Sequence, residues 1–188
     1  FKAGQQYTRY LAGFDYRPQT IAVLQSGTHT TLQDYPGRVG YWDIGVPPCG
    51  PMDSLAFRIA NRLVGNDESA GGLEITATGP TLKFNIDSVV ALTGAPVCAE
   101  INGEALQAWC STRVPAGSVL KIRGVQSVGQ RAYLAVAGGF DVPQYMGSRA
   151  TSTLGQFGGH AGRALRAGDT LRLFEATPQS AMRVCPRE

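Results

Sequence analysis

Residues 33–66 read QDYPGRVGYWDIGVPPCGPMDSLAFRIANRLVGN, a turn-rich loop that runs directly into an amphipathic segment. In the second half, apolar residues recur at the spacing that places them in one stripe along a helix. The stripe consists of Leu55, Ala56, Ile59, Ala60, Leu63 and Val64. This pattern predicts a principal helix from about Asp53 to Val64 whose apolar face packs on a core.

Both ends of the predicted helix carry stop signals. Asp53 stands at the N-cap position, where its carboxylate can accept from the free N–H groups of the first turn. Gly65 and Asn66 follow the last apolar residue, and both residue types favour the left-handed conformation that ends helices. The sequence therefore specifies where this helix starts and where it stops.

The loop before the helix has two interpretations. Its Pro-Gly, Pro-Pro and Gly-Pro pairs at 36–37, 47–48 and 50–51 prevent any long regular element, as in an ordinary structural connector. The loop is also long and rich in polar and aromatic groups, which favours a ligand-binding role. These groups are Asp34, Arg38, Tyr41, Trp42 and Asp43.

Composition indicates one globular, mainly β domain. The chain has 188 residues, of which 43% are hydrophobic and 16% charged, and its 24 glycines and 11 prolines indicate many tight turns. A scattered net charge of +3 does not favour nucleic acid as a partner. Without a signal peptide or an apolar run of about 20 residues, no membrane association is expected and the predicted location is cytoplasmic.

Short apolar runs predict the strands. The first four runs after the helix are spaced by roughly 8–12 residues with turn signals between them, which is typical of a barrel or a sandwich. They are Leu73–Thr76, Thr81–Phe84, Val89–Thr93 and Val97–Ile101. Further strands are predicted at Val119–Ile122, Arg131–Ala137 and Leu165–Leu173. Asn102-Gly103 predicts a hairpin between Ala99–Ile101 and Leu106–Trp109, and Ile21–Leu24 with Thr28–Leu32 predicts another.

Several residues outside the loop bear on function. Arg149 lies in GSRATST (147–153), where it either binds a carboxylate or phosphate or braces the loop. The four cysteines form no CxxC pair and there are only two histidines, so no metal site is predicted. The glycine-rich stretch GQFGGHAG (155–162) lacks the GxxxxGK[ST] arrangement and is predicted to be a flexible loop.

Residues 30–53 and 56–66, TTLQDYPGRVGYWDIGVPPCGPMD and AFRIANRLVGN, resemble the start of the carboxyltransferase domain of urea carboxylase. The segments GGFDVP (138–143) and GSRATST extend the resemblance, which covers roughly residues 14–173. It implies a cyclophilin-like β-barrel that transfers the carboxyl group from carboxybiotin to urea, giving allophanate. The task of the protein would be to position the reactants and stabilise the developing oxyanion.

The same resemblance implies how the chain is divided and what works with it. Residues 1–20 would link to a preceding biotin carboxylase domain, and residues 21–174 would form the N-terminal part of the carboxyltransferase domain. Residues 175–188 lie beyond the resemblance, and their composition predicts a disordered tail. Biotin would be carried on another domain or chain, and ATP would be used by the separate biotin carboxylase domain. The expected partners are the biotin carboxylase and biotin carboxyl carrier domains, the remaining half of the carboxyltransferase and urea, and the isolated fragment is expected to be inactive.

The catalytic residues are not predicted, but substrate-binding candidates are. They are Gln33, Asp34, Arg38, Asp53, Asn61 and Arg149. Two alternatives stay open. One is a component similar to the subunit of bacterial 5-oxoprolinase that shares the same N-terminal motifs, and the other is a non-catalytic partner or regulatory module.

Overall fold

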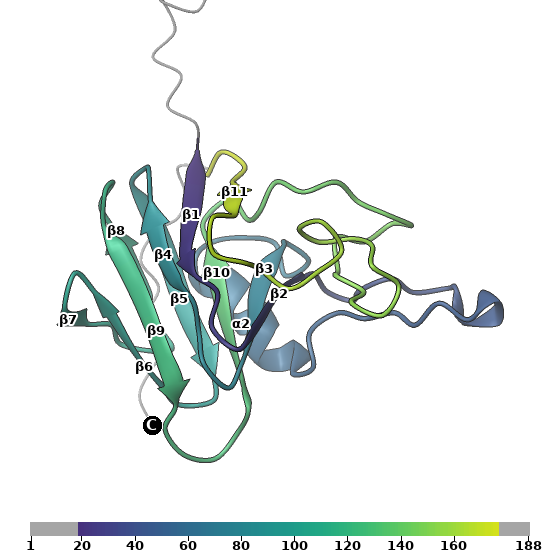
Figure 1. Ribbon diagram of the computed structural model, residues 1–188, viewed down its shortest axis with the longest axis horizontal. Helices are drawn as coiled ribbons and strands as arrows, with labels where there is room; N and C mark the ends of the chain where they lie inside the picture. Colours follow the sequence, from purple (N-terminus) through teal and green to yellow (C-terminus); the bar gives the residue numbers. More distant parts are fainter. Residues whose placement is uncertain (1–18, 177–188) are drawn as a thin grey trace, which may run out of the picture.

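The structure is a computed structural model that describes residues 19–176, and the strands in this range form two antiparallel sheets. The six-stranded sheet has the order β11-β1-β4-β9-β6-β7, and the five-stranded sheet has the order β2-β3-β10-β5-β8. The α-helix α2 (Ser54–Leu63), the only one within residues 19–176, lies behind the five-stranded sheet in the view of Figure 1. The described fold therefore has three layers: sheet, sheet and helix.

The strands are short, as the turn spacing predicts. The six-stranded sheet contains β1 (Thr20–Gln25), β4 (Thr81–Phe84), β6 (Val97–Ile101), β7 (Glu104–Ala105), β9 (Val119–Val125) and β11 (Thr170–Arg172). The five-stranded sheet contains β2 (His29–Gln33), β3 (Gly72–Thr76), β5 (Ser88–Gly94), β8 (Ser111–Val114) and β10 (Arg131–Val136).

The five-stranded sheet is buried on both faces, and β10 shows why its sequence is continuously apolar. Ala132, Leu134 and Val136 point into the core between the two sheets, whereas Tyr133 and Ala135 belong to a second core beneath α2. Successive residues of a strand face opposite sides, so a strand covered on both sides must be apolar at nearly every position.

The helix prediction is confirmed in extent and at both caps. The Asp53 side chain accepts from the backbone N–H of Ala56 at 3.0 Å, and Gly65 has a positive φ of 80° directly after the helix. One member of the predicted stripe is wrong, because the side chain of Leu55 is 62% exposed. Phe57 is buried instead and meets the ring of Tyr133 edge-on, with the ring centroids 5.9 Å apart.

Leu63→Ala is expected to lower the free energy of unfolding by about 2–5 kcal/mol, because it empties a buried site beneath α2. Leu55→Ala is the matched control on the same helix, and its expected change lies within about 0.5 kcal/mol because the side chain is exposed. Guanidinium denaturation followed by circular dichroism measures both values. Equal losses in the two variants would contradict the assigned helix face.

The described strands do not form a closed barrel, so the prediction of a β-barrel is wrong. The edge strands are β11 and β7 in the six-stranded sheet, and β2 and β8 in the five-stranded sheet. The prediction of a mainly β chain with one principal helix is confirmed. A series of short strands separated by turns is equally typical of a sandwich and of a barrel. The two differ in whether the edge strands of the sheet pair with each other, and no local sequence pattern indicates that pairing.

The predicted N-terminal hairpin is also wrong, although both of its strands exist. β1 pairs with β11 and β4, whereas β2 pairs with β3 in the other sheet. Between them Gly27 has a φ of 71°, and the N–H of Thr28 donates to the carbonyl of Thr78 at 3.1 Å, which directs the chain from one sheet to the other.

The hairpin at Asn102-Gly103 is confirmed, but its return strand is only Glu104–Ala105 and does not extend over Leu106–Trp109. Likewise the last strand covers Thr170–Arg172 and not all of Leu165–Leu173.

Two predicted segments lie largely outside the described residues: the tail beyond residue 176 and the linker before residue 19. Within residues 19–176 no helix is long and apolar enough to cross a membrane.

Candidate functional site

Two long connections extend from the same side of the sheets in Figure 1: the loop between β2 and α2, and the connection between β10 and β11. We call them the β2–α2 loop (residues 34–53) and the β10–β11 connection (residues 137–169). Four of the six candidate residues join these two segments, and most of the joining groups are buried.

Asp34 holds the β10–β11 connection with both carboxylate oxygens. Its Oδ1 accepts from the hydroxyl of Ser148 at 2.6 Å, and its Oδ2 accepts from the backbone N–H of Arg149 at 2.6 Å. The Asp34 residue is only 5% exposed. Buried carboxylates are tolerated when they are hydrogen-bonded in this way, so the two contacts are what make Asp34 compatible with its position.

Arg38 is the largest fully buried side chain of the described residues, with 1% exposure. Its Nε donates to the carbonyl of Tyr145 and its Nη2 to the carbonyl of Ala150, both at 2.9 Å. The guanidinium carbon also lies 4.7 Å from the ring centroid of Phe157 and 5.9 Å from that of Tyr145. Nη1 is buried and has no hydrogen-bond partner among residues 19–176.

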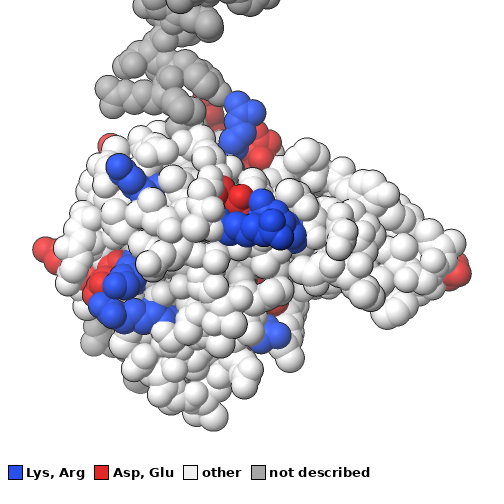
Figure 2. Space-filling view, in the orientation of Figure 1, with Lys and Arg blue, Asp and Glu red and all other residues white. Residues whose placement is uncertain are grey.

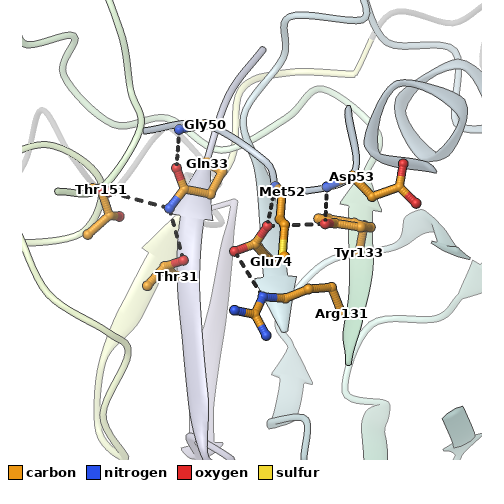
Figure 3. A network of polar contacts seen from close by, with 9 residues as sticks. All are labelled: Thr31, Gln33, Gly50, Met52, Asp53, Glu74, Arg131, Tyr133 and Thr151. Atoms are coloured by element: carbon orange, nitrogen blue, oxygen red, sulfur yellow. Dashed lines mark hydrogen bonds and ion pairs between the residues drawn. The ribbon is translucent and has the colours of Figure 1, made fainter. Parts of the chain in front are cut away.

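Gln33 joins three segments through its side-chain amide (Figure 3). Its Nε2 donates to the hydroxyl of Thr31 at 3.0 Å and, at 3.4 Å, to the carbonyl of Thr151. Its Oε1 accepts from the backbone N–H of Gly50 at 3.1 Å. The amide therefore ties the end of β2 both to the β2–α2 loop and to the β10–β11 connection.

A second network fixes the last residues before α2 (Figure 3). Oε2 of Glu74 accepts from the N–H of Met52 at 2.7 Å and from the hydroxyl of Tyr133 at 3.1 Å, and that hydroxyl accepts from the N–H of Asp53 at 2.7 Å. Oε1 of Glu74 lies 3.6 Å from Nε of Arg131. Because Glu74 and Tyr133 project from paired strands, the sheet itself positions the start of the helix.

Burial raises the pKa of the Tyr133 phenol above its usual value, and the nearby Glu74 carboxylate acts in the same direction. The folded protein therefore holds this proton more tightly than the unfolded chain does. The resulting stabilisation is present in full below the ordinary tyrosine pKa of about 10 and is lost as the pH rises above it.

Tyr133→Phe is expected to flatten the fall in stability at high pH. Between pH 9 and 11 the wild-type free energy of unfolding should fall more steeply than that of Tyr133→Phe, by up to about 1.4 kcal/mol per pH unit above pH 10. Guanidinium denaturation at each pH measures the two slopes. Identical slopes would show that Tyr133 does not titrate differently in the folded and unfolded chains.

The remaining candidates have different surroundings. Arg149 donates from Nε to the carbonyl of Val142 at 3.2 Å and lies with its guanidinium 5.4 Å from the ring centroid of Phe174. Asn61 is fully buried in α2, donates to the carbonyl of Ala70 at 2.9 Å and accepts from the side chain of Asn66 at 3.0 Å. Thus Gln33, Asp34, Arg38 and Arg149 meet at the β10–β11 connection, Asp53 caps the helix, and Asn61 fastens the helix to the segment after it.

Three residues that form hydrogen bonds at the site were not predicted from the sequence: Glu74, Tyr133 and Ser148. Glu74 carries a local signal, since it is the one charged residue of the strand GLEIT and alternates with two core residues. Tyr133 likewise alternates with core residues in RAYLAV. Ser148 has no local signal, because its partner Asp34 lies 114 positions away along the chain.

The tip of the β2–α2 loop projects away from the sheets (Figure 1). It contains the short 3-10 helix η1 (Trp42–Ile44), in which Trp42 and Ile44 are 67% and 70% exposed. Gly45 N–H donates to the carbonyl of Trp42 at 2.8 Å, so the tip is closed by its own backbone. The base of this loop is thus buried and polar, whereas its tip is exposed and carries two large apolar side chains beside the charged Asp43.

Comparison with known proteins gives consistent matches. The chain is 47% identical over 173 residues to a urea amidolyase from Lachancea kluyveri, covering 92% of this chain and 9% of that protein. It is 44% identical over 162 residues to a 5-oxoprolinase subunit from Escherichia coli, covering 85% of this chain and 51% of that protein. The chain therefore spans about a tenth of the urea amidolyase and about half of the oxoprolinase subunit.

Solved structures agree with the sequence matches. A crystal structure of the Kluyveromyces lactis urea carboxylase superposes with a TM-score of 0.84 at 44% identity, over 99% of this chain and 16% of that one. A family model described as the carboxyltransferase domain, subdomain A and B, matches residues 44–187. On sequence and on structure alike, the chain belongs to the carboxyltransferase domain family.

Proposed function

We propose that this chain is the N-terminal part of the carboxyltransferase region of a biotin-dependent urea carboxylase, which moves a carboxyl group from carboxybiotin to urea to give allophanate. The observation that carries the proposal is the 47% identity to a urea amidolyase over 92% of the chain. The similarity to the Kluyveromyces lactis urea carboxylase over 99% of the chain supports it.

We assign this domain's share of the transfer site to the junction between the β2–α2 loop and the β10–β11 connection. Four candidate residues meet there: Gln33, Asp34, Arg38 and Arg149. The buried Nη1 of Arg38 has no hydrogen-bond partner in the part of the chain that the structure describes, and guanidinium N–H groups form strong, charge-assisted hydrogen bonds to carboxylates. The residues at the junction therefore fit a carboxylated ligand.

Carboxybiotin, when bound, supplies the carboxyl group that is transferred, and the residues of this chain bind and orient the reactants. Asp34 fixes the backbone of Arg149, and Gln33 fixes Gly50, so the two segments keep a constant separation. Rigid placement of this kind contributes to catalysis by holding reacting groups in a productive geometry. Asp53 and Asn61 contribute through the helix that anchors the loop.

The rest of the assembly follows from the same proposal. Biotin is attached to a biotin carboxyl carrier domain, and ATP is used by a biotin carboxylase domain to which residues 1–20 would connect. Residues 21–174 would belong to the N-terminal part of the carboxyltransferase, and the remaining half of that domain would complete the site. The isolated chain is accordingly expected to form no allophanate from carboxybiotin and urea.

A chimera tests the proposal. The segment of Lachancea kluyveri urea amidolyase that matches this chain is replaced by this chain, and the purified chimera is assayed for urea-dependent ATP consumption and for allophanate. Retained formation of allophanate is the expected result. A chimera that is folded and carboxylates biotin, yet transfers nothing to urea, would contradict the proposal.

A role in 5-oxoprolinase is the second candidate, favoured by 44% identity to the Escherichia coli subunit over 85% of this chain. The corresponding chimera in that subunit separates the two functions, because its assay uses 5-oxoproline in place of urea. Activity in this chimera together with inactivity in the urea amidolyase chimera would reverse the assignment.

A further inference from the structure

A pocket of about 460 Å³ opens between the start of β2 and the second half of the β10–β11 connection. Its lining does not include Asp34, Arg38 or the residues that bond to them, and the glycine-rich stretch 155–162 forms part of its wall. The side chains and backbone that line it include His29, Thr153, Gln156, Ala161, Arg163 and Arg166.

Some basic side chains at this pocket are paired with a carboxylate, whereas others have no partner among the described residues. Arg163 forms two 2.8 Å hydrogen bonds to the carboxylate of Asp169, and His160 lies 3.5 Å from the same carboxylate. In contrast, the Arg166 guanidinium and the His29 imidazole have no hydrogen-bond or ion-pair partner among residues 19–176. Asp169 therefore neutralises Arg163, and the positive charge of Arg166 is left available at the pocket.

Figure 2 shows Lys and Arg side chains gathered on this face over the segment that leads into β11, with a smaller acidic area beside them. The backbone N–H of Arg166 donates to Asp169 at 2.8 Å, so the arginine backbone is fixed while its side chain stays exposed. A fixed backbone places the guanidinium near the pocket without tying up its donors.

The wall of the pocket is held in a costly conformation. Gln156 and Ala161 have positive φ values of 56° and 57°, although neither is glycine. Such residues are unfavourable in isolation and persist where the surrounding structure imposes them, which is common at binding sites. Here the loop is imposed by backbone hydrogen bonds from Gly159 to Arg149 at 2.9 Å and from Gly162 to Gly158 at 2.8 Å.

The same loop reaches the proposed transfer site. A Cβ on Gly158 would lie 2.2 Å from the carbonyl oxygen of Ala150 and 2.8 Å from Nη2 of Arg38. The wall of the pocket and the enclosure of Arg38 are thus parts of one tightly packed loop.

We propose that this pocket is a binding site for a compact oxyanion, the carboxylate or phosphate group of a small molecule. The forked guanidinium of Arg166 and the imidazole of His29 bind it, and Arg163 is held in place as part of the wall. Planar guanidinium groups suit carboxylate and phosphate oxygens because they donate two parallel hydrogen bonds. This site goes beyond the proposed carboxyl transfer and does not depend on it.

The two histidines of the sequence, His29 and His160, make the test direct, because each gives its own imidazole proton resonances in a one-dimensional NMR spectrum. His160→Gln assigns them. The chain is titrated at constant pH and ionic strength with inorganic phosphate in one arm and with succinate in the other. A saturable shift of the His29 resonances is expected in at least one arm, and the responding arm identifies the source of the oxyanion.

Arg166→Ala is expected to weaken the apparent affinity by about tenfold or more, because it removes charge-assisted hydrogen bonds. Arg166→Lys should recover only part of the loss, since lysine keeps the charge but not the fork. Arg113→Ala is the control, since Arg113 is an exposed arginine of another pocket, and it should leave the titration unchanged. Linear shifts in both arms, or equal shifts in wild type and Arg166→Ala, would overturn the proposal.

Discussion

Arg38→Lys is expected to lower allophanate formation by about 100-fold in the urea amidolyase chimera while biotin carboxylation stays near normal. Arg38 donates to Tyr145 and Ala150 through two different nitrogens, and its buried Nη1 has no hydrogen-bond partner among the described residues. Lysine keeps the charge but presents a single ammonium group, so it cannot reproduce three donors in one plane. The carboxylated ligand and the loop around it would both be misplaced.

Three measurements separate a role at the site from a purely structural one. They are the rate of allophanate formation, the rate of biotin carboxylation and the melting temperature. Arg62→Lys is the control, because Arg62 lies on α2 with a side chain that is 67% exposed and should tolerate the change in all three. Transfer by Arg38→Lys at the wild-type rate, or a loss that only follows the melting temperature, would place the site elsewhere.

Local sequence predicted those parts of the fold that local interactions determine. The helix with its Asp53 cap, the Asn102-Gly103 turn and the strand that became β5 all depend on residues close in sequence. The pairing of β1 with β11 joins the two ends of the described chain, and no local pattern specifies it. The predicted hairpin failed for this reason: the strands were identified, but their neighbours were not.

The candidate site, too, was predicted only in part from the sequence. Sequence resemblance drew attention to Gln33, Asp34, Arg38 and Arg149, and the structure shows these four at one junction. Their buried surroundings could not be inferred, because Arg38 reaches carbonyl groups more than 100 positions away. Such residues can contact the substrate directly, or they can hold in place the segments that contact it. The burial of each side chain distinguishes these roles, and burial cannot be read from a single sequence.

Asp34→Ala is expected to lower the free energy of unfolding by about 3–5 kcal/mol, because it leaves one buried and one part-buried donor without an acceptor. These donors are the Ser148 hydroxyl, in a residue 1% exposed, and the backbone N–H of Arg149. Asp34→Asn keeps one acceptor oxygen and should cost less. Guanidinium denaturation of the isolated chain measures both values.

A double-mutant cycle with Ser148→Ala isolates one of the two contacts. Because the 2.6 Å bond joins a hydroxyl to a buried carboxylate, its coupling energy is expected to be about 1.5–3 kcal/mol. The bond to the Arg149 backbone survives in Ser148→Ala, so this variant alone should cost less than Asp34→Ala. Additive effects of the two substitutions would mean that Asp34 does not hold the β10–β11 connection through Ser148, and the junction would then need another anchor.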